Sequence, residues 1–139
     1  MITMGQAKKA WNDKIFFEEY PTNPHSYTLN GFMFALLGIY DWSQTSALSE
    51  DERKSASEYF RRGVETLDLI LPLYDFNGMS SYDLSHLTAP GRRPQFTGNY
   101  HGVHIELLAA IHSITSDPLL LDYEQKWRSY VADLMSDNK

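Results

Sequence analysis

Residues 26–42 read SYTLNGFMFALLGIYDW, and this stretch decides the fold class. Its apolar side chains recur at steps of three and four residues, which predicts a helix. Because other apolar residues fill the gaps between them, we expect this helix to be buried on several sides. The repeating positions are Leu29, Phe32, Met33, Leu36, Leu37 and Tyr40.

Three more helices are expected downstream. Residues 50–71 follow Ser49, which can form a capping box with the residue three positions on, and Pro72 is expected to end or kink this helix. A third helix is expected over residues 102–115, and a fourth begins at residue 117 with an Asp-Pro pair, a good helix start. The result is an all-α domain made of two helical pairs.

The connection between the two pairs is long, from residue 72 to residue 99. Asn77 and Gly78 are a strong turn signal, and we expect a short β-hairpin with arms at 73–75 and 81–84. Helical pairs occur in bundles, solenoids and α/α toroids, and in toroids the loops at one end carry the active site. Long ordered connections of this kind are usually functional.

Composition limits the class of protein. The 12 basic and 18 acidic residues give a net charge of -6, which argues against nucleic acid as a partner. The chain has no cysteine, which excludes disulfides and thiol catalysis. It contains no run long enough to cross a membrane and no signal-peptide pattern. The aromatic content of 14% suits either a packed core or a sugar-binding cleft.

Three tyrosines stand outside the helical stripes, in polar and turn-rich segments. They are Tyr20, Tyr82 and Tyr100, and Glu19, His86 and His101 lie near them in sequence. Each tyrosine alone fits amphipathic packing, but three on loops that can converge favour a site. A phenol needs such a neighbour to act as a base, because its ordinary pKa is near 10. This chemistry suits proton abstraction beside a carboxylate.

A metal site is not expected. His101 and His104 share a helix face, but Glu106 does not, so a third ligand is missing and hydrogen-bonding roles are favoured. No phosphate-binding loop or nucleophile elbow is present, and no cofactor is expected.

An ordered series of short segments covers roughly residues 17–130. The segments are Glu18-Glu19-Tyr20-Pro21-Thr22, Leu29-Asn30-Gly31-Phe32-Met33, Gly38-Ile39-Tyr40-Asp41, Leu71-Pro72-Leu73-Tyr74-Asp75, Tyr82-Asp83-Leu84 with His86, Tyr100-His101 with His104-Ile105, and Lys126-Trp127 with Ser129-Tyr130. In order and spacing this series resembles the C-terminal region of the D-glucuronyl C5-epimerases (heparosan-glucuronate 5-epimerases).

The resemblance implies part of an α/α toroid and an isomerase that inverts carbon 5 of D-glucuronate to L-iduronate in a heparan-type polysaccharide. It implies the Golgi lumen in animals and gives no compartment in microbes. Because a toroid needs more helices than this chain shows, we expect residues 1–139 to be one helical domain from a longer protein. The alternative is a surface completed by self-association into a homo-oligomer.

The resemblance also implies roles for individual residues. Its functional positions fall on Glu19, Tyr20, Tyr82 and Tyr100, and substrate contacts are expected from His86, His101 and Asn30. Ser85 stands where the family has a substrate-contacting arginine, so Arg92 or Arg93 on the same loop is the expected replacement. Two other functions remain open: a polysaccharide lyase with a tyrosine base, and a non-catalytic helical module that binds acidic glycans or a protein.

Overall fold

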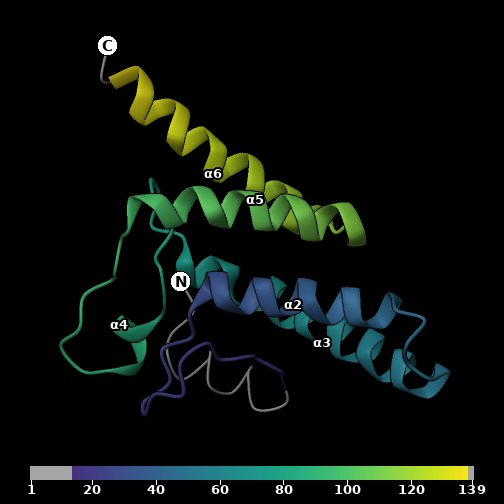
Figure 1. The fold of residues 1–139 in the computed structure, drawn as a ribbon. Coiled ribbons are helices and arrows are strands. Elements are labelled where there is room, and N and C mark those ends of the chain that lie inside the picture. Colours follow the sequence, from purple (N-terminus) through teal and green to yellow (C-terminus); the bar gives the residue numbers. More distant parts are fainter. Residues whose placement is uncertain (1–13, 138–139) are drawn as a thin grey trace.

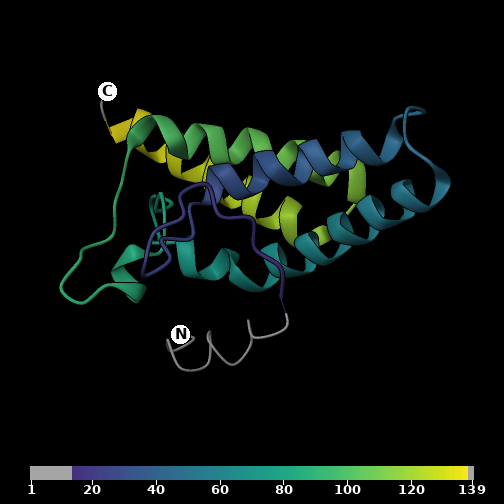
Figure 2. The ribbon, with the colours of Figure 1, turned by 60° about the horizontal axis from the view of Figure 1, so that its bottom comes forward.

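The computed structural model describes residues 14–137, and this part of the chain is built from helices and loops (Figure 1). The helices are α2 (Leu29–Gln44), α3 (Glu50–Tyr74), α4 (Ser85–Thr88), α5 (Gly98–Thr115) and α6 (Pro118–Asp137). Helices α2 and α3 form one antiparallel hairpin, and α5 and α6 form a second. The hairpins pack against each other mainly through α2 and α5 (Figure 2). The all-α class is therefore confirmed.

The core lies between these hairpins. The stripe of α2 is buried as expected, with Leu29, Phe32, Met33 and Leu36 fully inaccessible to solvent. Close packing against α3 requires Gly63, because a Cβ atom at that position would collide with the side chain of Leu36. Apolar residues of the other helices complete the core: Phe60, Val64, Leu67, Ile70, Leu71, Ile105, Leu108, Ile111, Leu120 and Trp127.

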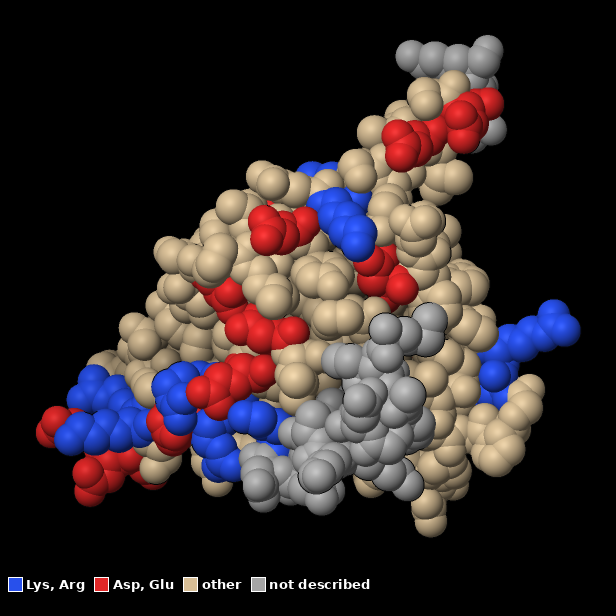
Figure 3. Space-filling view, turned by 180° about the vertical axis from the view of Figure 1, so that it is seen from behind, with Lys and Arg blue, Asp and Glu red and all other residues tan. Residues whose placement is uncertain are grey.

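The start of α3 agrees with the sequence pattern. The Ser49 hydroxyl accepts the Glu52 backbone N–H at 3.2 Å, and the Glu52 carboxylate accepts the Ser49 N–H at 2.8 Å. These reciprocal bonds form the predicted capping box. On the outer face of the helix, Arg61 pairs with Glu58 and Glu65, and Figure 3 shows basic and acidic side chains intermingled on one side of the molecule.

Three helix boundaries differ from the prediction. Helix α2 begins at Leu29 rather than residue 26, because Tyr27 has a left-handed backbone with φ 55°. Helix α3 contains Pro72 and runs on to Tyr74, whose buried hydroxyl donates to the Tyr27 carbonyl at 2.6 Å. Helix α5 begins at Gly98, four residues before the expected start.

The predicted β-hairpin is wrong in its extent. The turn itself is present, with Asn77 at φ 53° and the Phe76 N–H donating to the Met79 carbonyl at 3.0 Å. Within residues 14–137, however, the turn carries only an isolated antiparallel bridge between Asp75 and Ser80 and no strand. Most of the expected first arm belongs to α3 instead. None of the helices described between residues 14 and 137 is long and apolar enough to span a membrane.

Candidate functional site

The three tyrosines come together around Tyr82, which lies in the segment between α3 and α4. The rings of Tyr82 and Tyr100 meet edge to face, with their centroids 4.7 Å apart and an angle of 62° between planes. Tyr82 also forms a hydrogen bond with Tyr20 and lies within the electrostatic field of Glu19. The structure thus joins residues from three separate segments of the chain.

Backbone hydrogen bonds hold these segments in place. The Tyr82 carbonyl accepts the N–H of Leu29 at 3.1 Å, which ties the central loop to the start of α2. The Tyr82 N–H donates to the Gln95 carbonyl at 2.8 Å, and the Leu84 N–H donates to the Ser26 carbonyl at 2.8 Å. Because these bonds flank Tyr82 on both sides, they fix its position relative to the loops that carry the other two phenols.

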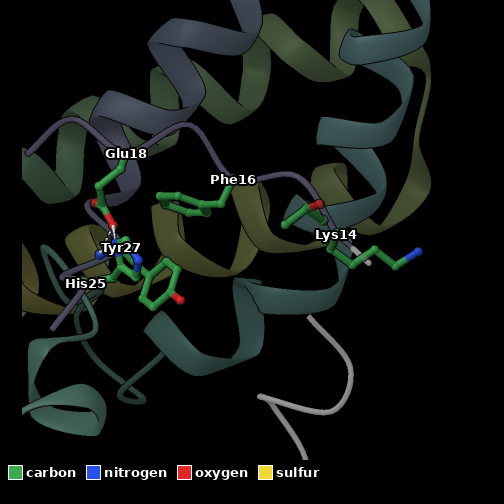
Figure 4. Close-up of a pocket in the computed structure, with 6 residues that line it drawn as sticks. Lys14, Phe16, Glu18, His25 and Tyr27 are labelled. Atoms are coloured by element: carbon green, nitrogen blue, oxygen red, sulfur yellow. Dashed lines mark hydrogen bonds and ion pairs between the residues drawn. The ribbon is translucent and has the colours of Figure 1, made fainter. Parts of the chain in front are cut away.

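Glu18 organises the first of these loops. Its carboxylate accepts the backbone N–H groups of Tyr27 at 3.1 Å and Thr28 at 3.3 Å, and it lies 3.6 Å from the His25 imidazole (Figure 4). It lines a small cavity of about 210 Å³ together with Phe16 and Tyr27. The sequence analysis missed this role, because two consecutive glutamates do not show which of their carboxylates accepts backbone N–H groups.

Glu19 packs against the first turn of α2. A Cβ atom at Gly31 would lie only 2.6 Å from the Glu19 Cβ and 2.9 Å from its carboxyl carbon. A glycine is therefore needed at position 31 for Glu19 to stay where it is. This packing places the carboxylate close enough to influence Tyr82.

The pKa of the Tyr82 phenol is raised. Burial is the largest cause, followed by the hydrogen bond with Tyr20 and the negative charge of Glu19. Tyr82 therefore stays protonated at neutral pH and is suited to donate a hydrogen bond. The other two phenols are more open to solvent, with exposed fractions of 46% for Tyr20 and 36% for Tyr100.

The loop after Tyr82 folds around a buried carboxylate. Asp83 accepts the Ser85 hydroxyl at 2.7 Å and the Ser85 N–H at 3.0 Å. The hydroxyl of Ser85 is therefore hydrogen-bonded within the protein, at the first residue of α4. Burial lowers the pKa of His86, although the negative charge of Asp83 opposes this effect. His86 therefore carries little positive charge at neutral pH. Its ring meets Phe76 edge-on, with centroids 5.2 Å apart.

The remaining candidates are spread over different environments. Arg92 and Arg93 are exposed on the loop between α4 and α5. Asn30 is buried in the first turn of α2, and its side-chain oxygen has no hydrogen-bond partner in the described part of the chain. His101 lies in the core, where its two ring nitrogens contact Ser80 and the Trp127 carbonyl. Among residues 14–137, no three His, Asp or Glu side chains gather as a metal site would require.

Comparison with known proteins assigns this chain to a family. The family model described as the D-glucuronyl C5-epimerase C-terminus matches residues 1–129. The chain is 38% identical to the D-glucuronyl C5-epimerase of Caenorhabditis elegans in an alignment of 124 residues that covers 84% of this chain and 20% of that protein. It is also 29% identical to an uncharacterized protein of Methanocaldococcus jannaschii over 113 residues, covering 81% of this chain and 33% of that protein.

The chain belongs to the D-glucuronyl C5-epimerase C-terminal family, as the sequence motifs indicated. It is thus related to an isomerase. It spans about a fifth and a third of the lengths of these two relatives.

Proposed function

We propose that this chain carries the phenol site of a uronate 5-epimerase, which converts D-glucuronate to L-iduronate within a glycosaminoglycan-type polysaccharide. The observation that carries the proposal is the meeting of Tyr20, Tyr82 and Tyr100, with Glu19 beside them, in a member of the C5-epimerase family. Inversion needs proton donors and acceptors around one carbon atom, and phenols can serve as both.

The reaction consists of two proton transfers at carbon 5. Tyr20, whose proton passes to Glu19, removes the hydrogen on one face of the sugar, and the electron pair of the broken C–H bond moves into the adjacent carboxylate. Tyr100 then gives its proton to carbon 5 on the opposite face, and a new C–H bond forms. Solvent then takes the extra proton from Glu19 and returns one to Tyr100, so no oxidant or cofactor is needed.

The intermediate carries extra negative charge on the carboxylate oxygens, and two groups in the loop are assigned to stabilise it. Tyr82 is the first, because its raised pKa keeps the phenol available as a donor. His86 is the second and donates as a neutral imidazole. Ser85 is occupied by Asp83, so we assign the positive charge that a uronate needs to Arg92 or Arg93.

The helical hairpins belong, in this proposal, to an α/α toroid. Two hairpins supply one sector of such a ring, and the share of the relatives' length that the chain covers agrees with a partial ring. We therefore propose that further helices, either from a longer protein or from a second copy of this chain, close the cleft around the polysaccharide.

Hydrogen exchange at carbon 5 tests the proposal directly. The protein is incubated with heparosan in deuterated water, and loss of the carbon-5 proton signal is followed by NMR. We expect exchange with the wild type and with Tyr59→Phe, an exposed tyrosine on α3, and a loss of about a hundredfold or more with Tyr100→Phe.

Two results would contradict the proposal. Folded wild-type protein that exchanges no hydrogen on any uronate polymer would remove the epimerase function from this chain. A product that absorbs in the ultraviolet would instead identify an unsaturated sugar, and with it a lyase. Full activity of Tyr100→Phe would remove the role of that tyrosine alone.

A further inference from the structure

A buried polar cluster is formed by residues that are close in sequence to two of the phenols. It consists of Ser80, His101 and His104, whose exposed fractions are 2%, 3% and 0%. The Ser80 hydroxyl lies 2.8 Å from the Nδ1 atoms of both histidines. Polar side chains buried this deeply in an apolar core are costly unless their hydrogen bonds are satisfied, so the geometry of the cluster is tightly constrained.

The contacts of His101 fix its tautomer. Its Nδ1 accepts the backbone N–H of Ser80 at 3.0 Å and must therefore lack a proton. Its Nε2 lies 3.0 Å from the Trp127 carbonyl, which can only accept, so Nε2 carries the proton. Neutral His101 thus bridges the central loop and α6, and a second proton on the ring would break the bond from Ser80.

His104 is held neutral as well. Burial lowers its pKa to about 3. Its Nε2 is buried without a hydrogen-bond partner in the described residues. If the His104 Nδ1–H donates to Ser80 and the Ser80 hydroxyl donates to His101, the atom left without a partner is a bare lone pair rather than an N–H group. In this arrangement every donor of the cluster has an acceptor, and the N–H and O–H groups of Ser80 share the single lone pair of His101 Nδ1.

The cluster connects two of the three phenol-bearing segments. Ser80 lies two residues before Tyr82, and His101 directly follows Tyr100 in α5. The bonds between Ser80 and His101 therefore join the backbones on which the two contacting rings stand, and they do so in the core, where side-chain motion is most restricted.

We propose that Ser80 and His101 are positioning residues that set the contact between Tyr82 and Tyr100. This inference rests on the proposed function for its catalytic consequence, but the ring contact itself can be measured without substrate. The ring contact and its catalytic consequence are therefore tested by separate measurements, and one can be refuted without the other.

The first measurement is the nuclear Overhauser effect between the ring protons of Tyr82 and Tyr100 in isotopically labelled protein. We expect Ser80→Ala to lose it while the cooperative unfolding transition is kept. The matched control is Ser81→Ala, because Ser81 is equally buried but its hydroxyl donates to the Asp83 carbonyl and not to α5. Equal loss in both variants would overturn the proposal, since any buried serine of the loop would then have the same effect.

A pair of substitutions at His101 tests whether a hydrogen-bond acceptor at this position is enough to keep the ring contact. In His101→Asn the side-chain oxygen has two lone pairs and can still accept both the N–H and the O–H of Ser80, whereas His101→Leu has no acceptor. We expect the ring contact to be retained in the first and lost in the second. Loss in both, or retention in both, would contradict the assigned role of Nδ1. Ser80→Ala keeps the proposal testable if His101→Leu does not fold.

The second measurement is the carbon-5 exchange rate. For Ser80→Ala we expect kcat to fall about tenfold and KM to change by less than about twofold, because misplacement of reacting groups slows chemistry more than binding. An unchanged kcat in a variant that has lost the ring contact would refute the catalytic part. Absence of exchange in the wild type would refute the proposed function and leave the positioning result intact.

Discussion

The pH dependence of stability should reveal a carboxyl group that is uncharged in the folded protein. Burial raises the pKa of Asp68 on α3 to about 7, and Asp117 and Glu65 add to the effect through a hydrogen bond and negative charge. In the unfolded chain the pKa of an aspartate is about 3.9. Between these two values the folded state binds a proton that the unfolded state does not, so the free energy of unfolding falls as the pH rises from about 4 to about 7.

The size of this effect follows from the gap between the two pKa values. At about 1.4 kcal/mol per pH unit, the gap gives an upper limit of about 4 kcal/mol. Asp68 is only half-buried, so solvent screening reduces the expected loss to ~1–2 kcal/mol. Asp68→Asn cannot ionise, and its amide can still donate to Asp117. We therefore expect the variant to match the wild type at pH 4 and to be more stable by ~1–2 kcal/mol at pH 8.

Urea unfolding followed by circular dichroism at several pH values between 4 and 8 measures this difference. Asp122→Asn is the matched control, because Asp122 is an exposed aspartate on α6 and its substitution should leave the wild-type pH profile in place. Parallel profiles of Asp68→Asn and the wild type would show that Asp68 is already ionised in the folded protein and would refute the reasoning.

Two further predictions concern glycines. Gly63→Ala should lower the free energy of unfolding by about 1–3 kcal/mol, because the new methyl group meets Leu36 in the core. Gly38→Ala should raise the free energy of unfolding by about 0.5–1 kcal/mol, because no atom lies within 4 Å of the new methyl group. Urea unfolding measures both, and a loss in Gly38→Ala as large as in Gly63→Ala would contradict the packing argument. Gly31→Ala should displace Glu19 and lower the rate of carbon-5 exchange as much as Glu19→Gln does. If Gly31→Ala exchanges at the wild-type rate while Glu19→Gln does not, the packing of Glu19 against position 31 does not matter for the reaction.

Much of the fold could be predicted because it depends on local patterns. The apolar period of α2 and the capping box at Ser49 act over a few residues, and both helices lie close to where these patterns placed them. The errors occur where long-range contacts override local preference. Pro72 does not end α3, because burial of Tyr74 stabilises the last turn, and Leu73 and Tyr74 remain helical instead of forming a strand.

The candidate site could be predicted only as a set of residue types, since the bonds that assemble it join residues far apart in the sequence. That Tyr82 would pair through its backbone with both Leu29 and Gln95 has no signature in any of the three segments. The contacts of His101 also have no local signature. The sequence analysis expected His101 to contact the substrate, whereas in the structure its ring nitrogens contact Ser80 and the Trp127 carbonyl.

Two adjacent residues of α5 therefore have different roles. Tyr100 is on the exposed side of the helix and His101 on the buried side, so a single turn presents a phenol to the solvent and anchors its own backbone in the core. Successive helical residues point about 100° apart, which makes this pairing possible without a bend in the chain. A substitution at His101 should therefore disturb the neighbouring phenol although the imidazole itself never reaches the surface.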